Sequence, residues 1–89
     1  MANSKIQRKS NVYWVEYDLP DMAGGELKNI TINGFSSAPS MIAVMDNSHA
    51  FGIIASNFWV SSGKLTVQLI LTGSTARPSG KITLIILYS

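Results

Sequence analysis

The chain has 89 residues, no cysteine and a formal net charge of +2, with 46% hydrophobic and only 13% charged residues. This length corresponds to a single domain, whose core can draw neither on disulfides nor on a thiolate-bound metal. The thin positive charge argues against a nucleic-acid-binding protein, which usually carries a broad basic stripe, and no apolar run is long enough for insertion into a membrane.

The first ten residues contain three of the seven cationic side chains, namely Lys5, Arg8 and Lys9. The apolar segment of a secretory signal is absent from this stretch. We expect residues 1–10 to form a flexible basic arm in solvent, with a phosphate-binding tail as the alternative. Residues 11–89 are then expected to form the single folded domain.

Beyond the arm, β-branched and aromatic runs alternate with clusters of Gly, Pro, Ser and Asn, and helical periodicity is absent. This pattern predicts short strands separated by turns. Six strands are predicted, at Asn11–Asp18, Leu27–Asn33, Met41–Met45, Phe51–Val60, Lys64–Thr72 and Lys81–Tyr88. Their spacing indicates an all-β fold, a small antiparallel β-sandwich of the jelly-roll kind, with a small closed barrel as the alternative.

The first predicted strand contains the sequence VYWVEY, in which alternation places Tyr13 and Tyr17 on one face and Trp14 on the other. Either face can present aromatic rings to a sugar, whose C–H surface packs well on them. Core packing is the plainer interpretation, and aromatic side chains serve interfaces equally well.

The last three predicted strands can be aligned from their turns. A three-residue loop ending in Gly63 separates two of them and suits a type I turn followed by a residue in the left-handed region. Pairing Val60 with Lys64, and Thr72 with Lys81 across the next loop, predicts a three-stranded sheet with one continuously apolar core face.

The second face of this predicted sheet is also rich in apolar residues, whereas an antiparallel sheet with one solvated face should be polar there. The residues that precede the sheet suffice to cover its core face alone. We therefore expect a second subunit to cover the other face in a homo-oligomer, expected to be a homotrimer; the alternative is that the N-terminal strands wrap both faces. The predicted interface residues are Ile54, Phe58, Ile70, Ile85 and Leu87.

Two polar loops contain the candidate ligand-binding residues, because a β scaffold usually places recognition on its loops. These candidates are Asp46, Asn47 and His49 in one loop, and Ser74, Thr75 and Arg77 in the other. Arg77 is the strongest, since its planar guanidinium suits carboxylate or phosphate groups; an ordinary solvated loop is the alternative.

Motifs for catalysis, a cofactor or a metal are not apparent in the sequence. His49 is the single histidine, whereas a metal site needs three or four ligands, and the spacing of the five carboxylates does not indicate an acid–base pair. We therefore predict no catalytic residues, no cofactor and no metal.

The segment Met41–Ser89 resembles the C-terminal head domains of bacteriophage tail fibres and receptor-binding proteins. The shared features are the hairpin FWVSSGKLTVQL, the loop TGSTARPSG and the final strand KITLIILYS. The resemblance implies a β-sandwich homotrimer on the tail or capsid surface of a virion, made in the host cytoplasm without a signal peptide. It also implies contact with other virion proteins and binding of host-surface polysaccharide, but assigns no role to an individual residue.

The leading hypothesis is therefore a non-enzymatic virion protein, a tail-fibre or receptor-binding head that mediates attachment to host-surface saccharide. One alternative is a capsid-decorating or other structural virion protein. Another is a small carbohydrate-binding lectin unrelated to phages, and a glycan hydrolase is the least favoured. The sequence specifies neither the ligand nor the host.

Overall fold

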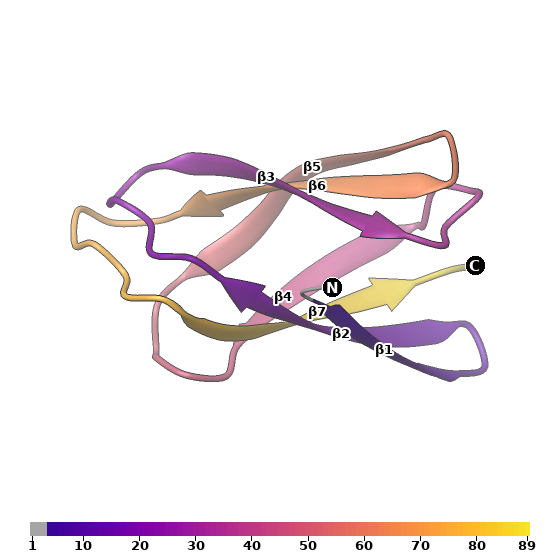
Figure 1. The fold of residues 1–89 in the computed structure, drawn as a ribbon, viewed down its shortest axis with the longest axis horizontal. Coiled ribbons are helices and arrows are strands. Elements are labelled where there is room, and N and C mark those ends of the chain that lie inside the picture. The colour runs from indigo at the N-terminus through magenta and orange to yellow at the C-terminus, as the bar shows by residue number, and fades with distance from the viewer. Residues whose placement is uncertain (1–3) are drawn as a thin grey trace.

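The computed structural model describes residues 4–89 of the chain, and their side chains from Ile6 onwards. These residues contain seven β-strands joined by turns and loops (Figure 1). The strands are β1 (Ser4–Lys9), β2 (Val12–Leu19), β3 (Leu27–Asn33), β4 (Met41–Asp46), β5 (Ile53–Ser61), β6 (Lys64–Leu71) and β7 (Gly80–Leu87). Among these residues no helix is long and apolar enough to span a bilayer. The all-β prediction is confirmed, and the six predicted strands correspond to β2 to β7.

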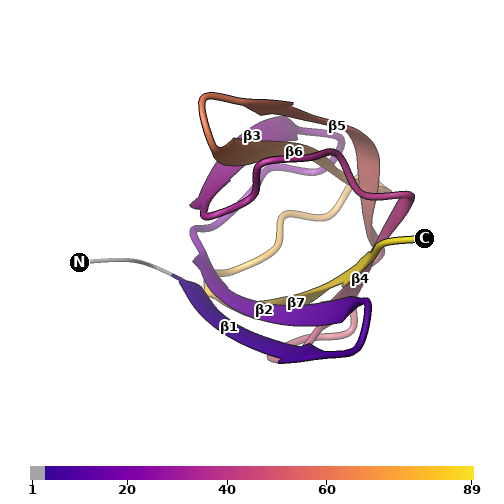
Figure 2. The same ribbon diagram turned by 90° about the vertical axis from the view of Figure 1, so that its right-hand side faces the viewer.

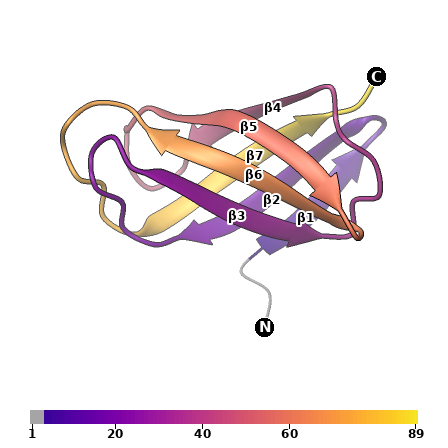
Figure 3. The same cartoon turned by 90° about the horizontal axis from the view of Figure 1, so that it is seen from above.

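The strands form two antiparallel sheets that pack face to face (Figure 2). The four-stranded sheet has the order β1-β2-β7-β4, and the three-stranded sheet has the order β3-β6-β5. Because β2 pairs with β7 and β3 with β6, the pairings nest inside one another along the sequence. This is the winding of a shortened jelly roll, a sandwich class whose usual form has eight strands. Seen from above, the strands of the two sheets cross obliquely (Figure 3).

The sandwich has two ends of different character (Figure 1). At one end, called here the loop end, the three connections β2–β3, β4–β5 and β6–β7 all cross between the sheets. At the other, the hairpin end, the tight turns β1–β2 and β5–β6 lie beside the β3–β4 connection and the C-terminal residues. This division decides where the candidate sites lie.

The expected flexible arm is instead the edge strand β1, at least over Ser4–Lys9; residues 1–3 lie outside the described residues. A two-residue turn at Ser10 and Asn11, with Ser10 at a φ of 55°, folds the chain back so that Arg8 lies opposite Tyr13. Pairing with β1 satisfies the backbone groups that β2 would otherwise leave unpaired. Cationic side chains suit this position, because charge on an edge strand discourages pairing with further chains.

The core lies between the two sheets and follows the period-two alternation of the strands. β6 and β7 dominate it, each contributing every second residue to the interior. The buried apolar residues are Val15, Leu19, Met22, Ile30, Ile32, Phe35, Ile42, Ile53, Leu65, Val67, Leu69, Leu71, Ile82, Leu84 and Ile86.

The predicted pairing of β6 with β7 is wrong, although the predicted core faces of both strands are correct. Leu69 and Leu84 are both fully buried in the core, but they belong to different sheets. The connection from Thr72 to Ser79 is long enough to pass from one sheet to the other. Two apolar strand faces are both buried when they pack against each other across the core. Side by side in one sheet, they would need a separate layer of the protein to bury them.

The β5–β6 hairpin has a two-residue turn, not the predicted three-residue loop. Ser61 pairs with Lys64, and both turn residues, Ser62 at 54° and Gly63 at 72°, have positive φ, which defines a type I′ turn. The positive φ predicted at Gly63 is confirmed. Ser62 is the less suitable of the two residues, since a Cβ is unfavourable in the left-handed region.

A β-bulge at Ser56 restores the predicted register farther from the turn. Near the turn Trp59 lies opposite Thr66, not Leu65 as predicted, whereas beyond the bulge Ala55 lies opposite Leu69 as predicted. The Ser56 hydroxyl donates to the Gln68 carbonyl oxygen at 3.2 Å and holds the extra residue in place. The bulge therefore exchanges the faces of the strand residues between it and the turn.

The predicted interface residues do not form one surface. Phe58 packs against the core because of the bulge, and Trp59 takes the outer position. Ile54 and Ile70 pair on the outer face of the three-stranded sheet, while Ile85 and Leu87 are on the outer face of the four-stranded sheet. The set was predicted as one face because β6 and β7 were placed in one sheet.

The turn provides a test of this hairpin. We predict that Gly63→Val lowers the free energy of unfolding by more than about 1 kcal/mol, since it forces a Cβ into the left-handed region. Ser62→Asn should raise it by a few tenths of a kcal/mol, because Asn-Gly is the preferred type I′ pair. Urea denaturation of both variants and the wild type checks this, and equal midpoints for all three would contradict the turn assignment.

Candidate functional site

The two predicted recognition loops do meet at the loop end, but their central residue is not available to a ligand. Arg77 is 0% exposed, and its main chain forms a two-way bridge with Met22 in the β2–β3 connection. The prediction that Arg77 projects into solvent is therefore wrong. Its role is to tie the β6–β7 connection to the loops beside it.

Arg77 forms a two-pronged ion pair with Asp46, whose side chain is only 4% exposed. Nε donates to Oδ2 at 3.0 Å and Nη2 donates to Oδ1 at 2.8 Å, while Nη1 donates to the Pro78 carbonyl oxygen at 3.0 Å. Such parallel bonds between a guanidinium and a carboxylate are among the strongest in proteins. Both residues were predicted as candidates for ligand binding, each in its own loop, and the contact between them was not predicted.

Asp46 also organises its own loop. Its carboxylate accepts hydrogen bonds from the backbone N–H groups of Ser48, His49 and Phe51 at 3.3, 3.0 and 3.2 Å. The hydrogen bonds from Arg77, followed by those from the backbone N–H groups of His49 and Phe51, hold the pKa of Asp46 far below its ordinary value despite its burial. The carboxylate is thus ionised, and all three connections of the loop end depend on it.

The other candidates at this end are mostly engaged with the protein itself. Asn47 accepts a bond from Thr83 at 2.6 Å, and the His49 ring lies 3.2 Å from the Ser79 carbonyl oxygen and edge-on to Phe51. Ser74 and Thr75 are exposed at the tip of the β6–β7 connection. No cluster of metal-ligating side chains occurs among the residues described. The ion pair and the hydrogen bonds of Asp46, Arg77 and Asn47 make this end a structural junction.

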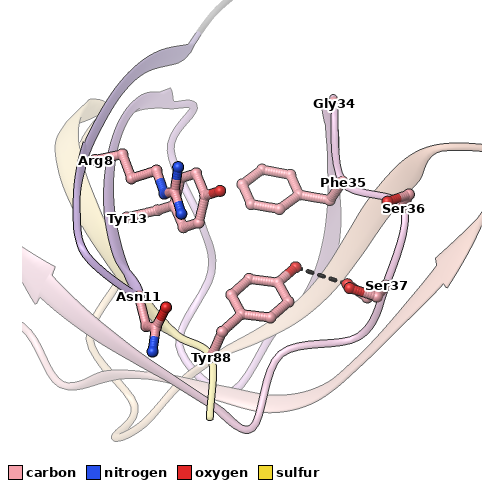
Figure 4. A pocket seen from close by; sticks show the side chains of 8 residues that line it. All are labelled: Arg8, Asn11, Tyr13, Gly34, Phe35, Ser36, Ser37 and Tyr88. Carbon is pink, nitrogen blue, oxygen red and sulfur yellow. Dashed lines mark hydrogen bonds between the residues drawn. The ribbon is translucent and has the colours of Figure 1, made fainter.

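A pocket of about 260 Å³ opens at the hairpin end, the opposite end of the sandwich (Figure 4). It lies where the β1–β2 turn, the start of the β3–β4 connection and the C-terminal end of β7 converge. Its lining residues are Arg8, Asn11, Tyr13, Gly34, Phe35, Ser36, Ser37 and Tyr88. Sequence analysis flagged Tyr13 as a possible sugar-facing ring but missed the site, because its residues come from separate parts of the chain.

Three aromatic rings form the pocket wall. Tyr13 meets Phe35 and Tyr88 edge-to-face, with ring centres 5.2 and 5.8 Å apart, and the Phe35 and Tyr88 rings are parallel at 6.4 Å. All three rings contact the buried core. The rings are therefore held by packing before any ligand arrives.

Polar groups complete the pocket around the rings. The Tyr88 hydroxyl donates to the Ser37 carbonyl oxygen at 2.6 Å, as the dashed line in Figure 4 marks. Burial raises the pKa of the Tyr88 phenol, so the hydroxyl stays protonated. Gly34, at a φ of 94°, turns the chain so that Phe35 points inward and the serines line the rim.

A second hollow, of about 210 Å³, lies on the outer face of the four-stranded sheet. It is lined by Gln7, Trp14, Glu16, Met45 and Thr83. Trp14 is its one aromatic ring, and the surrounding sheet surface is apolar. The hollow therefore lacks the ring cluster that distinguishes the pocket of the hairpin end.

Comparison with known proteins adds no relative to this picture. No protein-family model matches the chain, and no curated protein or solved structure matches it either.

The ion pair makes a sharp prediction about stability. We expect Arg77→Ala to lower the free energy of unfolding by about 3–5 kcal/mol, because it leaves the Asp46 carboxylate buried and unpaired. The control is Lys81→Ala, which removes an exposed ion pair with Asp18 of equal length, 2.8 Å, and should cost far less stability because water screens the two charges. Chemical denaturation at neutral pH distinguishes them, and similar losses for both variants would contradict the structural role of Arg77.

The same pair predicts how stability depends on pH. The depressed pKa of Asp46 means that the unfolded chain takes up a proton near pH 4 while the folded chain does not. The stabilisation is therefore complete above about pH 4 and is lost progressively as the pH falls below that value. Melting curves between pH 2 and 7 should show this decline in the wild type and a shallower one in Asp46→Asn.

Proposed function

We propose that the protein is a non-enzymatic attachment module that binds a saccharide in the pocket of the hairpin end. The observation that carries the proposal is the cluster of Tyr13, Phe35 and Tyr88 rings beside polar groups in one concave site. Ligand sites typically combine an apolar, aromatic lining with a few placed polar groups. Sugars match this combination, because their C–H faces pack on rings while their hydroxyls need hydrogen bonds.

The size and polarity of the pocket support a short segment of a polysaccharide. Its volume, about 260 Å³, is just below the usual range for ligand pockets of roughly 300–1,000 Å³. Asn11, Ser36 and Ser37 at its rim are exposed and can exchange hydrogen bonds with sugar hydroxyls. No carboxylate is among its described lining residues, which favours binding over acid–base hydrolysis.

The resemblance of Met41–Ser89 to tail-fibre heads supports placing this module on a virion, where it would attach the particle to host-surface polysaccharide. In that setting the expected assembly is a homotrimer in contact with other virion proteins. A lectin unrelated to phages would use the same pocket in the same way, and differs only in the particle that carries it.

The alternative of a capsid-decorating or other structural virion protein is favoured by a separate observation, the apolar outer face of the four-stranded sheet. Met41 is 54% and Met45 is 48% exposed there, and the strand register brings them beside further apolar residues. The apolar residues of this outer face are Val12, Trp14, Met41, Ala43, Met45, Ile85 and Leu87. Contiguous apolar patches on a small protein mark interaction surfaces.

A second copy of the chain is the proposed occupant of this outer face. Two consecutive rows of the register on this face are entirely apolar, so a further copy of the chain, whose own face is equally apolar, can bury them. These rows are Val12, Leu87 and Met41, and then Trp14, Ile85 and Ala43. The outer face of the three-stranded sheet is less suitable, since polar pairs such as Asn29 with Gln68 interrupt it.

Saccharide binding is tested with two variants of one strand. Tyr13→Leu removes a ring of the pocket, whereas Tyr17→Leu removes a half-buried ring on the same face of β2 that does not line it. On an array of bacterial envelope polysaccharides we predict that Tyr13→Leu loses about tenfold in affinity, the loss expected for one stacked ring, while Tyr17→Leu binds as the wild type does. Absence of binding by the wild type, or equal loss in both variants, would refute the proposal.

Assembly is tested on the two outer faces. We predict that the wild type is a homo-oligomer by light scattering at micromolar concentration, and that Met41→Lys shifts it to monomers because a charge is buried in the contact. Leu27→Lys is the control, since Leu27 is 55% exposed on the other sheet and should leave the mass unchanged. A monomeric wild type would overturn the assembly, and dissociation by Leu27→Lys alone would move the contact to the other face.

A further inference from the structure

The pocket of the hairpin end contains one charged side chain, that of Arg8 (Figure 4). The other seven lining residues, all within the described part of the chain, include no carboxylate and no second cationic side chain. The aromatic rings and serines therefore surround a single, uncompensated positive charge. This asymmetry of charge indicates which class of saccharide the pocket binds, an inference that rests on the proposed function.

The structure holds the Arg8 guanidinium in a defined orientation. Its Nε donates to the Ser10 carbonyl oxygen at 2.9 Å, and its Cζ lies over the Tyr13 ring, 5.4 Å from the ring centre. One edge of the guanidinium is thereby bonded and one face is stacked. The two Nη groups form no hydrogen bond to any side chain or backbone group described, and they remain as paired donors for a ligand.

We infer that the pocket selects acidic saccharides, in which a sugar carboxylate pairs with the Nη groups of Arg8 while the sugar ring packs on Tyr13 and its neighbours. Two parallel donors fit the two oxygens of a carboxylate. A single guanidinium balances the one charge of a carboxylate, whereas a phosphate monoester carries up to two charges at neutral pH. The carboxylate is accordingly the favoured anion, and a phosphate-bearing sugar is a separate outcome of the test.

The experiment uses an array of bacterial capsular and O-antigen polysaccharides in three groups: neutral, uronic-acid-containing and phosphate-containing. Each uronic-acid polysaccharide is also presented after reduction of its carboxylates to primary alcohols, which removes the charge and keeps the backbone. We expect the wild type to bind members of the uronic-acid group and to lose at least about tenfold in affinity for their reduced forms.

Two matched variants assign the effect to Arg8. Arg8→Gln should weaken binding to the acidic polysaccharides by about tenfold or more and leave any weak binding to the reduced forms unchanged. Lys9→Gln removes the same charge from the adjacent residue, which points to the other face of β1 and does not line the pocket, and it should bind as the wild type does. Arg8→Lys should recover only part of the affinity, since Lys cannot form the paired bonds.

The outcomes separate the inference from the proposed function. Binding that is confined to neutral or phosphate-containing polysaccharides, or that survives carboxylate reduction, would overturn the acidic-saccharide inference and leave the attachment function standing. Equal losses in Arg8→Gln and Lys9→Gln would overturn it too, because the effect would then be one of overall charge. No binding to any polysaccharide would remove both.

Discussion

The ion pair between Asp46 and Arg77 is the interaction on which the rest of the structure depends. It joins the β4–β5 connection to the β6–β7 connection, and the backbone bridge between Arg77 and Met22 adds the β2–β3 connection. A chain of 89 residues without cysteine has no covalent means of holding three crossing loops together. The buried pair performs that task, since breaking either half would leave an unpaired charge in the interior.

With the loop end fixed in this way, the pocket of the hairpin end is the site proposed for recognition. There the rings of Tyr13, Phe35 and Tyr88 belong at once to the core and to the pocket, so their positions are set by the packing of both sheets. A site whose rings are already ordered loses little conformational freedom when a ligand binds. The two ends therefore differ in character. The buried ion pair stabilises the loop end, whereas packed aromatic rings and one accessible cation line the pocket of the hairpin end.

The outer faces of the two sheets account for the high share of hydrophobic residues and the low share of charged residues in the chain. With 46% hydrophobic residues, the sequence has more apolar side chains than one small core can hold, and the excess is displayed outward. On the four-stranded sheet this excess is contiguous across β2, β7 and β4; on the three-stranded sheet polar pairs divide it. This contiguity is the reason why the first of these faces is the one proposed to bind a second copy.

The sequence by itself determined the all-β class, the positions of β2 to β7, the core faces of β6 and β7 and the positive φ of Gly63, because alternation and turn chemistry are local properties. Tertiary structure decided the rest: that β6 and β7 face each other in different sheets, that a bulge turns Phe58 inward, and that Arg77 is buried. The pair it forms with Asp46 joins residues 31 positions apart, and the pocket of the hairpin end unites segments from both ends of the chain. Such contacts produce no periodic pattern in the sequence, because they depend on which segments meet in space. Which segments meet is decided when the apolar faces of the two sheets pack against each other.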